Sequence, residues 1–124
     1  PTSNPRDIMQ QFSSWYPLTD EGVDEHAPDG PAALQIKRAD GLVDYPGGKS
    51  AMVCYFYAGD RAADALRERF GDEIDSPGTR GHGELLFRYL EGQEDAKETL
   101  GDVLFKFVKN FGEPPLFNRH PEEE

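Results

Sequence analysis

Apolar and polar positions alternate over residues 32–38 and 85–90, the period of two that is typical of half-buried strands. Turn-forming residues after the first segment lead to a short apolar stretch at 42–46, and this order predicts a hairpin. Residues 51–58 contain no charged or strongly polar side chain, so we expect a central strand that is buried on both faces.

A helical period of about 3.6 residues predicts two longer helices. Residues 61–70 place four apolar side chains on one stripe, with Asp60 as the expected N-cap, and the helix is expected to stop where the loop of residues 71–82 begins. Residues 94–111 carry a longer stripe, and Gly112 followed by two prolines is expected to end that helix. This longer stripe consists of Ala96, Leu100, Val103, Leu104, Phe107, Val108 and Phe111.

The N-terminal third has weaker patterns. A short helix is expected to begin at Pro5, and residues 13–31 show neither period, so we expect an extended wrap anchored by Trp15, Tyr16 and Leu18. The resulting order is a helical arm, three strands, a helix, a strand, a helix and a tail. Antiparallel strands with interspersed helices predict a small α+β fold, a mostly antiparallel sheet flanked by helices.

Charge is distributed unevenly along the 124 residues. The net charge is −11, and residues 1–30 account for −5 of it, with six acids against Arg6, while the terminal Glu122-Glu123-Glu124 adds −3. A chain of this length usually folds as one domain. We therefore divide it into an acidic N-terminal arm (1–30), an α+β domain (31–118) and an acidic tail (119–124).

This charge disfavours the whole chain as a non-specific partner of DNA or of an anionic membrane, and leaves DNA binding only to a local basic groove. No apolar stretch approaches the ~18 to 20 residues that cross a bilayer, and the first ten residues lack the pattern of a signal peptide. We expect a soluble, cytoplasmic protein without a membrane partner. The single Cys54 lies in an apolar segment and is expected to be an inert core thiol.

Two local patterns in the sequence do not predict a site. Gly47-Gly48-Lys49-Ser50 contains the end of a phosphate-binding loop, but Val43 stands where that loop needs a glycine, and a strand rather than a helix follows. We expect a β-turn with Lys49 pointing to solvent. The histidines lack the spacing of metal ligands; they are His26, His82 and His120.

Four short segments occur between Pro31 and Asn118 in an order that is informative. They are Pro31-Ala32-Ala33-Leu34, Tyr55-Phe56-Tyr57-Ala58-Gly59, Leu66-Arg67-Glu68-Arg69-Phe70 and Pro115-Leu116-Phe117-Asn118. Taken together they resemble the motifs of the GIY-YIG nuclease domain. That resemblance implies a small sheet flanked by helices that cuts DNA phosphodiesters with a tyrosine, an arginine and a metal-binding glutamate.

The resemblance also implies roles for individual residues. Tyr55 or Tyr57 would help activate water, Arg69 would stabilise charge on the phosphate, and Asp102, which stands near the usual glutamate, would hold Mg²⁺ or Mn²⁺. Two further residues are expected to serve binding; they are Arg67 and Asn118.

The motifs depart from the family at two chemically important places. Leu34 stands where the first motif has its tyrosine, and Asp102 is one methylene shorter than glutamate. Our leading hypothesis is therefore a non-catalytic binding or interaction module that needs no cofactor. The alternatives are a metal-dependent DNA endonuclease and an acidic structural subunit that docks on a basic protein partner through its N-terminal arm.

Overall fold

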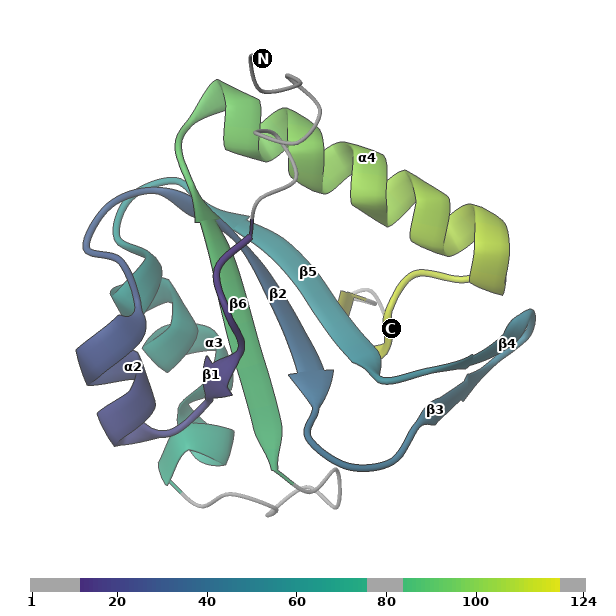
Figure 1. The fold of residues 1–124 in the computed structure, drawn as a ribbon, viewed down its shortest axis with the longest axis horizontal. Helices are drawn as coiled ribbons and strands as arrows, with labels where there is room; N and C mark the ends of the chain where they lie inside the picture. Colours follow the sequence, from purple (N-terminus) through teal and green to yellow (C-terminus); the bar gives the residue numbers. More distant parts are fainter. Residues whose placement is uncertain (1–11, 76–83, 119–124) are drawn as a thin grey trace, which may run out of the picture.

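The computed structural model describes residues 12–75 and 84–118, and in them a four-stranded antiparallel sheet lies between helices (Figure 1). The order of strands across the sheet is β1 (Tyr16–Pro17), β6 (Leu85–Glu91), β2 (Ala32–Arg38) and β5 (Met52–Ala58). The predicted α+β class, a mostly antiparallel sheet flanked by helices, is confirmed.

Helices cover both faces of this sheet. Figure 1 shows α4 (Glu94–Phe111) on one side, and α2 (Asp20–His26) and α3 (Ala62–Asp75) on the other. A separate hairpin of β3 (Val43–Tyr45) and β4 (Gly48–Ser50) projects beside the end of α4, and the short 3-10 helix η1 (Leu116–Asn118) packs against β5. No described helix is long and apolar enough to cross a membrane.

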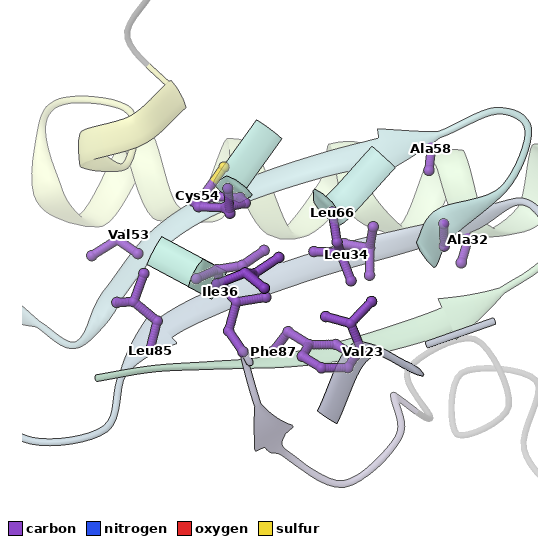
Figure 2. Packing of buried hydrophobic residues seen from close by; sticks show 14 residues of the cluster. Val23, Ala32, Leu34, Ile36, Val53, Cys54, Ala58, Leu66, Leu85 and Phe87 are labelled. Carbon is purple, nitrogen blue, oxygen red and sulfur yellow. The ribbon is translucent and has the colours of Figure 1, made fainter. Parts of the chain in front are cut away.

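The sheet separates two apolar clusters. Figure 2 shows the larger one, in which Leu34 and Ile36 of β2 pack with Leu66 of α3 and Phe87 of β6, all fully buried. The smaller cluster lies under α4 and consists of Ala33, Tyr45, Tyr55, Ala96, Leu100 and Phe107. Because alternate residues of β2 enter different clusters, this strand is buried on both faces.

The predicted position of residues 51–58 is wrong, because β5 is an edge strand. Strand β2 is the central one: Leu34 lies opposite Phe56 of β5 on one side and opposite Tyr89 of β6 on the other. Strand β5 is apolar all round because helices cover both of its faces. An apolar strand therefore indicates that both faces of the sheet are covered, but not whether the strand has one or two neighbouring strands.

The predicted hairpin between residues 32–38 and 42–46 is also wrong. Strand β3 pairs with β4, and the long antiparallel partner of β2 is β5. The turn of the small hairpin docks on α4, since the Gly47 N–H donates to the Phe111 carbonyl at 2.9 Å and a Cβ on Gly47 would lie 2.3 Å from a backbone oxygen. Lys49 is exposed, as predicted, and pairs with Asp44 at 2.5 Å, but it lies in β4 and the turn itself is formed by Pro46 and Gly47.

Helix α4 agrees with its prediction at both ends. It runs from Glu94 to Phe111, and Gly112 adopts the left-handed conformation with a φ of 87°, donating its N–H to the Val108 carbonyl at 2.8 Å. The predicted stripe faces the sheet, with Leu100 and Phe107 buried.

Helix α3 differs from its prediction at both ends. Asp60 is not the N-cap: the helix starts at Ala62, and two carbonyls of the connection between α2 and β2, those of Gly30 and Pro28, accept its first two N–H groups. The predicted stop at residue 71 coincides with a break in the helix, but a second helical segment follows it. The chain bends at Phe70, whose φ and ψ are −121° and 28°, and continues to Asp75, because Ile74 remains buried in the core.

Residues 13–31 are more structured than the expected extended wrap. They contain β1 and α2, and the Thr19 side chain caps α2 by accepting the Gly22 N–H at 3.0 Å. The expected anchor Leu18 is buried in the main core, and the Tyr16 ring stacks on His26 at 3.9 Å. The predicted helix from Pro5 and the acidic tail lie outside the described residues, as do two of the histidines, His82 and His120.

Candidate functional site

The Asn118 side chain forms a two-point contact with the edge of β5. The Tyr55 N–H donates to Asn118 Oδ1 at 2.7 Å, and Asn118 Nδ2 donates to the Tyr55 carbonyl at 2.6 Å. The two prolines after α4 turn the chain back toward the sheet, and the following η1 presents the amide to the strand. Both hydrogen-bonding ends of the amide are therefore used within the fold.

Arg69 reaches the same place from α3. Its Nη2 donates to the Phe117 carbonyl at 3.2 Å, and its guanidinium lies 4.9 Å from the centre of the Phe56 ring. It also lies beside Cys54, but burial outweighs this positive neighbour and raises the pKa of the Cys54 thiol to about 11. Cys54 is buried in the main core, which agrees with an inert thiol.

The two candidate tyrosines point to the α4 side of the sheet. The Tyr55 ring is buried and meets Phe107 edge-on at 5.7 Å. Burial raises the pKa of Tyr55 to about 12, with a smaller opposing effect from Arg88, so the phenolate that could accept a proton from water is disfavoured. The Tyr57 hydroxyl donates to the Gly92 carbonyl at 3.2 Å.

Arg67 and Asp102 lie away from this group. Arg67 forms an ion pair with Asp20, and its Nη2 donates to the Asp20 carbonyl at 3.2 Å, so it ties α3 to α2. Asp102 is exposed on α4, which packs on the opposite face of the sheet from α3. The structure therefore brings Arg69, Asn118 and the Tyr55 backbone together and leaves Arg67 and Asp102 elsewhere.

The resemblance assigns Asp102 the binding of Mg²⁺ or Mn²⁺. These ions are held by several oxygen ligands, usually including more than one carboxylate or a substrate phosphate. Within residues 12–75 and 84–118, no three side chains of histidine, cysteine, aspartate or glutamate converge on one point. Asp102 therefore belongs to no group of three such side chains in the described chain, and its metal role stays a prediction.

A groove that the sequence did not reveal lies between β5 and α3. It has a volume of about 500 Å³ and is open to solvent. Its lining residues are Phe56, Tyr57, Ala58, Gly59, Asp60, Arg61, Asp64, Ala65, Glu68 and Arg69. The spacing of four between Asp60, Asp64 and Glu68 was the pattern that could have revealed an acidic face here.

A polar cluster that the sequence did not predict lies on the α4 side of the sheet. Arg88 Nε donates to Gln35 Oε1 at 2.6 Å, and its guanidinium lies 4.6 Å from the centre of the Trp15 ring. Lys37 lies over the same ring at 4.4 Å, so Trp15 is a packing residue. Burial lowers the pKa of Arg88. The polar groups of Arg88 and Lys37 therefore contact Gln35 and Trp15 within the fold.

Comparison with known proteins finds no matching family model, no matching curated protein and no matching solved structure. The resemblance to the GIY-YIG domain stays a prediction, and the function is argued from the residues of this chain.

Proposed function

We propose that this chain is a non-catalytic module that binds another protein. The observation that carries the proposal is the use of Arg69 and Asn118 within the fold: both bond to backbone atoms, of Phe117 and Tyr55 respectively. A residue that stabilises a phosphate in a transition state needs its donors directed at the substrate. Here these donors join η1 to α3 and to the edge of the sheet.

The charge of the groove supports the same proposal. Three carboxylates, on Asp60, Asp64 and Glu68, stand against two guanidinium groups, on Arg61 and Arg69. A nuclease must bind a phosphate backbone, which requires a net positive path. This groove instead favours partners that are neutral or basic.

A nicking assay tests the absence of nuclease activity. We expect supercoiled plasmid and branched DNA to stay intact with the purified protein and Mg²⁺ or Mn²⁺. We also expect Arg69→Ala and Asp102→Ala to match the unsubstituted protein, with Glu98→Gln, an exposed carboxylate on α4, as the matched control. Nicking that is lost in Arg69→Ala and Asp102→Ala but kept in Glu98→Gln would overturn the proposal in favour of the endonuclease.

Docking on a basic partner through the acidic N-terminal arm is a second proposal, supported by the exposed Glu21, Asp24 and Glu25 on α2. Removal of residues 1–30 does not test it, because Leu18 and Val23 belong to the core. We expect the fold to survive when the three carboxylates are changed to amides, because all three are exposed. Unchanged capture of a basic partner by that variant would contradict this second proposal.

A further inference from the structure

We propose that the sheet edge at the end of β5, from Tyr57 to the adjoining Gly59, accepts an extended, basic segment of a partner protein as an added strand. The inference rests on the proposed function as a binding module, and it specifies the surface and the chemistry of the partner. Extended peptides commonly bind in this way, with main-chain hydrogen bonds to an exposed edge strand and side chains in an adjacent groove.

The backbone of β5 presents unpaired groups at this edge. Among the described strands, β5 pairs with β2 alone, and the N–H and carbonyl of Tyr55 point away from β2, since they bond to Asn118. In an antiparallel pair this direction recurs at every second residue, so the N–H and carbonyl of Tyr57 point outward too. No residue of the described chain forms a hydrogen bond with these two groups.

Asn118 marks the point where the free edge begins. Proteins usually block an exposed edge, because it is a template for pairing with another chain. Here the side-chain amide of Asn118 pairs with Tyr55, and η1 packs beside it. Beyond Tyr55 the same edge borders the open groove, so the fold closes one half of β5 and leaves the other half accessible.

The wall of the groove can receive the side chains of an added strand. Phe56 and Ala58 of β5 face α3, where they pack with the main core, and Ala65 of α3 lies across from them. The small Ala65 leaves space between helix and strand, which suits the aliphatic stem of a lysine side chain. Glu68 stands one helical turn further along the same wall, within reach of the next side chain on that face of an added strand.

Charge identifies the occupant as basic. Arg61 is balanced by Asp29 and Asp64, each at 3.4 Å. Two exposed carboxylates of the groove, Asp60 and Glu68, form no ion pair with any residue in 12–75 or 84–118. Arg69, the other cation of the groove, forms no ion pair with a described residue either. Two unpaired carboxylates against one guanidinium leave a net negative charge, which attracts lysine or arginine. A second copy of this chain would bring the same carboxylates and a net charge of −11, which opposes edge-to-edge pairing of two copies.

A defined peptide tests the inference with the full-length protein. The probe is fluorescent acetyl-Lys-Val-Lys-Val-Lys-amide, whose alternation matches an added strand, and its counterpart has glutamate in place of lysine. We expect the basic peptide alone to bind, more weakly at high salt, with slower hydrogen exchange at the Tyr57 N–H. We expect N-methylation of either the central lysine or the two valines to abolish binding, because only one of these two sets of main-chain N–H groups faces β5.

Matched charge reversals locate the site. Glu68→Arg should weaken binding of the basic peptide about fivefold, the effect of replacing one exposed attraction by a repulsion. Glu98→Arg makes the same change of charge on the exposed side of α4 and should leave the affinity unchanged. Both substitutions alter exposed side chains, so neither is expected to impair folding.

Four results would overturn the inference. They are no binding of the basic peptide, equal binding of the acidic one, equal effects of the two reversals, or unchanged exchange at Tyr57. Self-association that protects the Tyr57 N–H would also overturn it, and would assign the edge to a second copy. If the basic peptide does not bind and DNA stays intact in the nicking assay, only this inference is contradicted. If the protein nicks DNA specifically, the proposed function is contradicted.

Discussion

The side-chain amide of Asn118 acts on Tyr55 as a neighbouring strand would, donating to the carbonyl and accepting from the N–H. The identity of Asn118 matched a motif of the sequence, but its partner lies 63 positions away along the chain. A motif gives the type of a side chain and its local spacing. Whether its polar atoms face a substrate or the backbone depends on which segments pack together.

Substitution of Asn118 by alanine should lower the free energy of unfolding by about 2 kcal/mol, because two hydrogen bonds to a partly buried backbone are lost. Urea denaturation measures this change, and hydrogen exchange at the Tyr55 N–H should become faster. Asn110→Ala is the matched control, since Asn110 is exposed on α4, and should change stability by no more than about 0.5 kcal/mol. Equal effects of the two substitutions would contradict the structural role of Asn118.

Helix α4 and strand β5 differ in how well their sequence predicts them. The stripe of α4 recurs over 18 residues, and only one face of a helix can bury it, so its ends and its buried side agree with the prediction. The predicted extent of β5 agrees with the structure, but its predicted central position is wrong. An edge strand covered on both faces has the same apolar pattern as a central strand. The period of an amphipathic helix tells which of its faces is buried, whereas a uniformly apolar strand does not tell where it lies in the sheet.

Two phenylalanines of α4 test this difference directly. Phe107→Ala should lower the free energy of unfolding by about 4 kcal/mol, because it empties a buried position between Tyr45 and Tyr55. Phe105→Ala removes the same side chain at a position that is 69% exposed, so thermal and urea denaturation should show a change below about 0.5 kcal/mol. Comparable losses at both positions would contradict the orientation of α4.

At the scale of the whole molecule, the described N-terminal residues 12–30 contribute to the same core as the strands. Leu18 and Val23 lie in the main cluster with Phe87 and Leu66, and β1 extends the sheet beside β6. The boundary of the predicted arm at residue 30 follows charge and composition, which are properties of the surface. The described residues of this arm are acidic outside and apolar where they contact the sheet, so charge alone does not define a structural unit.

Unfolding should therefore be cooperative across this boundary. Leu18→Ala is expected to lower the free energy of unfolding by about 3 kcal/mol, whereas the exposed Glu21→Ala should change it by no more than about 0.5 kcal/mol. The fluorescence of Trp15, the single tryptophan, reports on the N-terminal segment, and far-ultraviolet circular dichroism reports on the whole chain. Both midpoints should coincide and shift together; a fluorescence transition at lower urea would instead indicate a separate arm.

The sequence by itself determined the α+β class, the extent of most strands, the helix of residues 94–111 and the residue types gathered near Asn118. These features follow from local periodicity and turn chemistry, which act over a few residues. Only the tertiary structure decided that β2 is central, that β5 is an edge strand and that Asp102 lies across the sheet from Arg69. Strand order and the convergence of side chains depend on contacts between segments far apart in the chain, and no local pattern contains them.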